Sequence, residues 1–191
     1  MLALCVLSFS GVLLMLSPTF RLEKAASVLA RAGLALAFFA LFWKGHIPTH
    51  GMMLFDPYAK TLSLLMIGIA FLVTLMVPTY VQRYSTKLTD FYALLIFSCV
   101  GGMTLVSYSH LGMLFIGIEI LSIPLYILAA SRVKDALSRE AGIKYFLLGS
   151  FASTLLLFGI ALIYSGSGIL TLPELCSLIQ SASALSPVMA V

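Results

Sequence analysis

Residues 115–128, FIGIEILSIPLYIL, place one carboxylate, that of Glu119, inside a run that is otherwise uncharged and mainly apolar. The uncharged surroundings extend from Leu111 to Ala130, about the 20 residues that a helix needs to cross a bilayer core. A charged side chain at the centre of a bilayer costs at least a few kcal/mol, so such residues usually face a bundle interior or an ion pathway. This stretch therefore predicts a transmembrane helix that must bury an acid.

The composition of the whole chain agrees with a membrane location. Of the 191 residues, 61% are hydrophobic and 9% are charged, and the mean hydropathy is +1.11. Soluble domains are about 25% charged, so the sequence predicts an integral membrane protein. The short segments of alternating polarity that are typical of a transmembrane barrel do not appear in the sequence. We expect an all-α, polytopic bundle of transmembrane helices.

Polar breaks divide the chain into apolar segments. Charged or Gly- and Pro-containing stretches such as SPTFRLEK and KGHIPTHG separate them, and these residue types end helices. We expect residues 1–165 to form one bundle of six spans. The predicted spans are Leu2–Leu16, Ala25–Trp43, Tyr58–Tyr80, Phe91–Tyr108, Leu111–Ala130 and Glu140–Tyr164.

The last part of the chain, residues 166–191, has a different character. It opens with a Gly/Ser turn, and Thr171 and Glu174 then have the spacing of a helix capping box. An apolar stripe over residues 175–179 predicts a short helix at the membrane interface. Residues 186–191, SPVMAV, begin a new apolar run, so we expect the start of a truncated seventh span and a chain that is part of a longer protein.

The distribution of Lys and Arg predicts the orientation, because positively charged loops stay in the cytoplasm. Eight basic residues fall on the face of the first, third and fifth loops, against two on the opposite face. The N-terminus and the segment after Tyr164 should therefore lie outside the cytoplasm. The eight are Arg21, Lys24, Arg31, Arg83, Lys87, Arg132, Lys134 and Arg139, and the two are Lys44 and Lys60.

Several functions receive no support from the sequence. The formal charge of +4 comes from scattered basic residues that form no stripe, so we expect no nucleic-acid partner. Cys5, Cys99 and Cys176 lack CxxC spacing, which favours neither a disulfide framework nor a metal site. No P-loop, dinucleotide-binding motif, haem or iron–sulfur ligand set, or Ser/His/Asp arrangement is present. We expect the chain to have no catalytic residues of these kinds and no redox cofactor of its own.

Glu119 and Lys144 are the ionisable residues that invite a functional hypothesis. Glu119 lies about ten residues, roughly 15 Å, from either end of its span, which is too far for its side chain to reach water. It is either a protonated acid that holds helices together or a proton-relay carboxylate. Lys144 lies about one turn inside the sixth span, where it either reaches the interface or stays internal with a lowered pKa. Pro124 frees the backbone carbonyl of Ile120, beside Glu119.

Three stretches resemble a known family. Residues 55–65 (FDPYAKTLSLL), 89–130, which contain GIEILSIPLY, and 140–168, which contain GIKYF, resemble the N-terminal half of NADH-quinone oxidoreductase subunit N. This family comprises antiporter-like membrane subunits of bacterial respiratory complex I. The resemblance implies an inverted-repeat bundle in which protons cross on buried Glu and Lys residues linked by water. Glu119 matches the family's Glu in GIE, and Lys144 matches its Lys in IKY, so both are proton-relay candidates.

The resemblance also implies a setting. The function would be proton translocation, coupled to quinone reduction elsewhere in an NADH:quinone oxidoreductase. NADH, quinone, FMN and iron–sulfur clusters would be found only in the parent complex. The partners would be the other membrane subunits of complex I and the lipid bilayer, in the bacterial inner membrane. Two alternatives stay open: a subunit of a multisubunit cation/proton antiporter, and a non-functional truncated remnant with a structural role.

Overall fold

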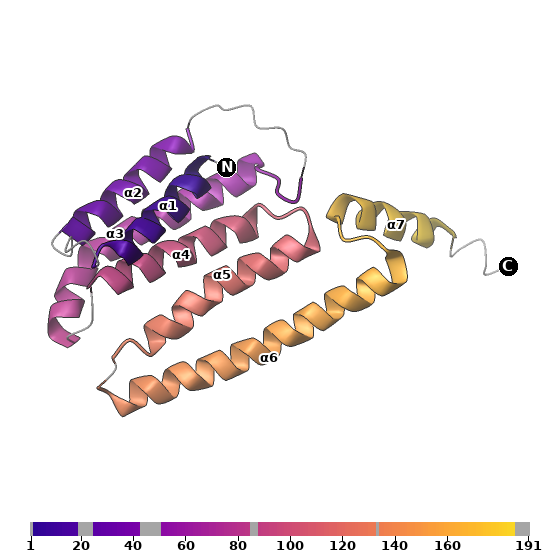
Figure 1. Cartoon of the computed structure of the whole chain (residues 1–191). Coiled ribbons are helices and arrows are strands. Elements are labelled where there is room, and N and C mark those ends of the chain that lie inside the picture. The colour runs from indigo at the N-terminus through magenta and orange to yellow at the C-terminus, as the bar shows by residue number, and fades with distance from the viewer. Residues whose placement is uncertain (1, 19–24, 43–50, 85–87, 133, 186–191) are drawn as a thin grey trace.

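A computed structural model describes residues 2–18, 25–42, 51–84, 88–132 and 134–185 (Figure 1). The described residues form seven helices and no named strand, which confirms the all-α fold. The helices are α1 (Leu2–Leu16), α2 (Ala26–Ala40), α3 (Pro57–Tyr84), α4 (Leu88–Val106), α5 (Leu111–Ala129), α6 (Ala136–Ser167) and α7 (Leu172–Leu185).

The first six helices coincide with the six predicted spans, but they are not equally long. Helices α3 to α6 are long and apolar enough to cross a membrane, with 19 to 32 residues each as spans. Helices α1 and α2 have 15 residues each. Fifteen residues rise about 22 Å, which is less than the roughly 30 Å of a bilayer core. As described, the first two helices are therefore shorter than a full membrane span. The end of the second predicted span, at Trp43, lies outside the described residues.

Helices α1 to α4 form a bundle that packs through small residues. Apolar burial gains little in lipid, so membrane helices associate where small side chains let their backbones approach closely. Helix α2 buries Ala26, Ala30 and Ala37 completely. A Cβ on Gly33 would lie only 2.7 Å from the Cβ of Ser10 on α1. The larger buried side chains fill the space between these close contacts, among them Leu7, Leu14, Leu34, Ile67, Tyr92 and Ile96.

The buried hydroxyl groups of this bundle bond to their own helices. Ser10 donates to the Leu7 carbonyl at 2.8 Å, and Thr104 donates to the Val100 carbonyl at 2.9 Å. Such bonds back to the preceding turn satisfy a hydroxyl without a neighbour. The same pattern holds for Ser17, Ser63, Thr74 and Ser107. The hydroxyls therefore fit as packing groups of the α1–α4 bundle.

Helix α5 packs on α4 through glycine contacts. A Cβ on Gly101 would overlap the backbone of α5 at Ile120 and Leu121, and a Cβ on Gly117 would lie 3.0 Å from the Leu105 nitrogen. Gly101 and Gly117 therefore let the backbones of α4 and α5 approach closely. These contacts hold α5 against the bundle on the side opposite to α6.

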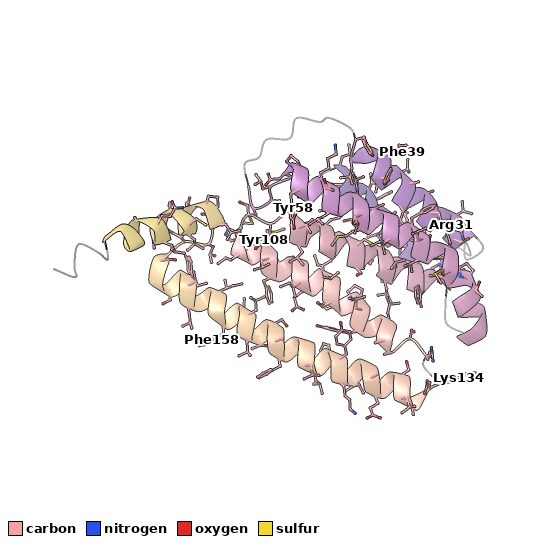
Figure 2. All side chains as sticks on the ribbon, turned by 180° about the vertical axis from the view of Figure 1, so that it is seen from behind. Arg31, Phe39, Tyr58, Tyr108, Lys134 and Phe158 are labelled. Carbon is pink, nitrogen blue, oxygen red and sulfur yellow. The ribbon has the colours of Figure 1, made fainter. Side chains whose placement is uncertain are left out.

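Helix α6 packs on α5 and forms one edge of the described helices (Figure 1). Only 6% of its apolar, potentially membrane-spanning stretch is buried. In Figure 2, Phe158 points away from the other helices, and its side chain is 61% exposed. One face of α6 thus contacts α5, and the rest of its surface is apolar and exposed.

The end of the bundle that contains the α4–α5 turn, here called the His110 end, is tied together by backbone hydrogen bonds. Ser109 donates to the Met52 carbonyl at 2.9 Å, and Leu111 donates to the Leu170 carbonyl at 2.9 Å. His110 is the N-cap of α5, because its Nδ1 accepts a hydrogen bond from the Gly112 nitrogen at 3.0 Å. The opposite end, which contains the α5–α6 turn, is called the Asp135 end.

Helix α7 begins after the α6–α7 turn at the His110 end (Figure 1). The Thr171 hydroxyl donates to the Glu174 carboxylate, so the predicted capping spacing does mark a helix start. The predicted seventh span would begin at residues 186–191, which lie outside the described residues.

Candidate functional site

Glu119 lies on the face of α5 that contacts α6. Residues at positions i, i+7 and i+11 of a helix share one face. Tyr126 and Ala130 stand at these spacings from Glu119, and both contact α6. A Cβ on Gly142 would lie 2.5 Å from the Cβ of Ala130, and a Cβ on Gly149 would overlap the Tyr126 hydroxyl. The half-buried Glu119 side chain therefore belongs to the α5/α6 interface.

The register of the two helices places a hydroxyl opposite Glu119. Helices α5 and α6 run antiparallel, and Gly142 faces Ala130 near the Asp135 end. Counting equal numbers of residues back along α5 from Ala130 to Glu119 and forward along α6 from Gly142 ends at Ser153. The half-buried Ser153 donates its hydroxyl to the Gly149 carbonyl at 3.0 Å.

Lys144 lies on the other side of α6. It follows Gly142 by two residues, so it points about 200° around the helix from the face that contacts α5. Its ammonium pairs with the Glu140 carboxylate at 2.5 Å, and the two side chains are 69% and 57% exposed. Lys144 also stands about 14 Å along the axis from the level of Ser153. The structure therefore does not bring Lys144 and Glu119 together.

The Glu140–Lys144 pair belongs to a class of exposed helix ion pairs whose contribution to stability has been measured. A Glu four residues before a Lys on an exposed helix face contributes about 0.3–0.5 kcal/mol in water. Next to lipid, the same pair would be more strongly held, because each charge would lose its water. The pair leaves the exposed face of α6 nearly neutral overall.

Pro124 lies buried inside α5. The Ile120 carbonyl lacks its usual helical donor because Pro124 has no N–H. The Ile120 carbonyl carbon would be 2.6 Å from a Cβ on Gly101, so α4 comes closest to α5 at this point. A freed backbone carbonyl one residue after Glu119 thus lies on the α4 side, while the Glu119 side chain is on the α6 side.

The sequence interpretation did not foresee the half-buried position of Arg31 between helices. The charge count treated it as a loop residue, but the structure places it inside α2, against the phenol of Tyr92 on α4. Its Nε is buried and has no hydrogen-bond partner among the described residues. Figure 2 shows Arg31 at the same end of the helices as Lys134. Arg31 lies inside the predicted second span, and this position already indicated that it is not a loop residue. Without Arg31, the count of basic residues that predicts the orientation is seven against two.

No metal site is apparent in the described part of the chain. No group of three or more His, Cys, Asp or Glu residues there could hold a metal ion. The three cysteines are free thiols, with Cys5 and Cys176 exposed. The side chains assigned to the α5/α6 interface include the Glu119 carboxylate and the Tyr126 and Ser153 hydroxyls.

The sequence is similar to those of known membrane proteins. Residues 108–190 match the family described as NADH:quinone oxidoreductase/Mrp antiporter, TM. The chain is 40% identical over 169 residues to NADH-quinone oxidoreductase subunit N of Cytophaga hutchinsonii, covering 87% of this chain and 37% of that protein. It is 37% identical over 181 residues to the protein of the same name from Flavobacterium psychrophilum, covering 93% and 40%. The chain thus spans about two fifths of the length of these relatives.

Solved structures share the fold of this chain. A chain of respiratory complex I from Thermus thermophilus, solved with bound aureothin, is 32% identical, with a TM-score of 0.70 over 89% of this chain and 38% of that chain. A chain of the archaeal membrane-bound sulfane sulfur reductase gives a TM-score of 0.75 over 93% of this chain and 39% of that chain. Its identity of 21% supports the fold alone.

Proposed function

The chain is a relative of NADH-quinone oxidoreductase subunit N over 87% of its length, and we propose that it is part of a proton-translocating membrane subunit of respiratory complex I. The complex would oxidise NADH and reduce quinone in other subunits. This chain would supply part of the membrane path for protons and no redox centre. NADH, FMN, iron–sulfur clusters and quinone would be bound elsewhere in the complex.

Glu119 is the residue that we assign to the proton path. Its position between α5 and α6 is the observation that supports this proposal. A carboxyl group can bind and release a proton, and acids inside a membrane commonly belong to proton or ion paths. Lys144 faces away from Glu119, so we propose that the basic partner of Glu119 is a lysine outside the described residues.

Lys144 would serve the opposite face of α6. Its ammonium is already paired with Glu140, and a second helix covering this face would bury the pair. Burial would make the charge of Lys144 sensitive to its neighbours. We propose Lys144 as a second proton-relay residue, acting toward the helices that cover α6.

Purification through a tag on the full-length protein tests the proposed complex. The purified material should oxidise NADH and reduce quinone, because the chain would remain attached to the subunits that hold the redox centres. A purification that yields cation/proton exchange activity in vesicles and no NADH oxidation would contradict it. That result would favour the antiporter alternative, which the family description also includes.

The proposed orientation in a bacterial inner membrane can be tested by cysteine labelling of the full-length protein. In a background in which the exposed Cys5 and Cys176 are replaced by Ser, Met52→Cys should react with an impermeant maleimide in intact cells. Lys134→Cys should react only after the membrane is opened, since the basic loops would be cytoplasmic. Both positions are exposed at opposite ends of the bundle. Labelling of residue 134 in intact cells would reverse the orientation.

A further inference from the structure

The α5/α6 interface contains hydroxyl groups beyond Glu119. Tyr126 is half-buried and lies on the same face of α5 as Glu119, two turns closer to the Asp135 end. Its hydroxyl lies against the backbone of α6 at Gly149, where the missing side chain leaves it room. Ser153, one turn further along α6, donates to the carbonyl of that same glycine at 3.0 Å.

These groups follow one another along the interface. Side chains in helices lean toward the N-terminus of their own helix, so the Tyr126 hydroxyl reaches back along α5 toward Glu119. It meets α6 at Gly149, and the next inward-facing turn of α6 carries Ser153 at the level of Glu119. The order from the Asp135 end is therefore Tyr126, Ser153 and Glu119.

The Tyr126 ring packs on α6 through contacts that do not involve its hydroxyl group. It contacts Tyr145 and Phe146 of α6 edge to face, with ring centroids 4.7 Å and 6.0 Å away. Within the part of the chain that the structure describes, no hydrogen bond to the Tyr126 hydroxyl is found, and its oxygen is not sealed off from the surface. A phenol oxygen in this position has its proton and its lone pairs available to water.

We propose that Tyr126 and Ser153 relay protons between Glu119 and the Asp135 end of α5 and α6, an inference that rests on the proposed function. In each transfer a hydroxyl oxygen accepts a proton from a protonated water molecule, which becomes neutral water, and releases its own proton to the next acceptor. Each side chain ends the step as a neutral hydroxyl, and no other bond changes. The final acceptor is the Glu119 carboxylate, which becomes the neutral acid.

The test compares Tyr126→Phe with Tyr145→Phe in the assembled complex. Tyr126→Phe keeps the ring and its edge contacts and removes only the hydroxyl. We expect proton translocation through this subunit to fall about 100-fold, at the low end of what positioned proton-transfer groups contribute. Tyr145→Phe removes a neighbouring hydroxyl from the same ring cluster and should leave translocation unchanged. The Tyr126 variant should also show a larger solvent deuterium isotope effect, which a packing defect would not cause.

A second pair of variants keeps the inference testable if Tyr126→Phe does not assemble. Ser153→Ala should lower translocation, and Thr154→Ala, at the next and exposed position of α6, should not. Wild-type translocation in both Tyr126→Phe and Ser153→Ala, with a loss in Glu119→Gln, would overturn the relay and leave the proposed function intact. Wild-type translocation in all three variants would overturn both.

Discussion

Replacing Glu119 with Gln should nearly abolish proton transfer through this subunit of the proposed complex while the complex still assembles. The amide keeps the shape and hydrogen-bonding capacity of the acid in the α5/α6 interface, but it cannot bind and release a proton. Positioned proton-transfer groups contribute about 100-fold to 10,000-fold to the rate of the step that they serve. We therefore expect transfer through this path to slow by at least about 100-fold.

The measurement is the number of protons translocated per NADH oxidised, in membranes that contain matched amounts of assembled complex. Glu119→Asp should retain more translocation than Glu119→Gln, because the shorter side chain is still an acid. Glu174→Gln is the matched control, since Glu174 is an exposed acid at the start of α7, outside the proposed proton path. If Glu119→Gln pumps like the wild type, the acid holds helices together and carries no protons.

Replacing Gly101 with Leu should prevent α4 and α5 from packing and should remove the protein from the membrane. A Cβ at this position would overlap the α5 backbone at Ile120 and Leu121, and a backbone cannot move aside as a flexible side chain can. Overpacking against side chains costs about 1–3 kcal/mol, and a clash with backbone should exceed this range. The same displacement would move Glu119, which lies next to Ile120.

Gly159→Leu provides the control for Gly101→Leu. Gly159 lies in α6, and nothing in the described chain comes within 4 Å of a Cβ built there. The measurement is the amount of full-length protein in membranes and its thermal stability in detergent. Equal stability of the two variants would contradict the close α4/α5 contact.

Hydropathy was sufficient to predict the helices but not their packing. The run Leu111–Ala130, uncharged except for Glu119, predicted α5 to within one residue, because Ser109 and His110 before it and Ser131 and Arg132 after it are polar. Hydropathy cannot tell whether a 15-residue apolar helix spans a bilayer, and α1 and α2 are such helices. The close approach of α6 to α5 at Gly149 became visible only in the structure.

The sequence singled out the candidate site residues one by one, but it did not predict which of their side chains face one another. The position of Glu119 in mid-span was visible in the sequence, but its direction depends on the contacts of Tyr126 and Ala130 with α6. The orientation of Lys144 depends on which face of α6 meets α5, and an apolar helix without a polar side gives no signal for this. Arg31 was counted as a loop charge because the count of Lys and Arg considered only the charge of each residue and not its position along the predicted span.

The protonation state of Glu119 during turnover tests the central claim most directly. Infrared difference spectra of the assembled complex, recorded with and without NADH, report the carbonyl stretch of protonated carboxylic acids. A proton-relay Glu119 predicts a carboxylic-acid band that changes when NADH is added and is absent in Glu119→Gln. The same NADH-dependent band in wild type and Glu119→Gln would contradict the account, because Glu119 would then keep one protonation state throughout.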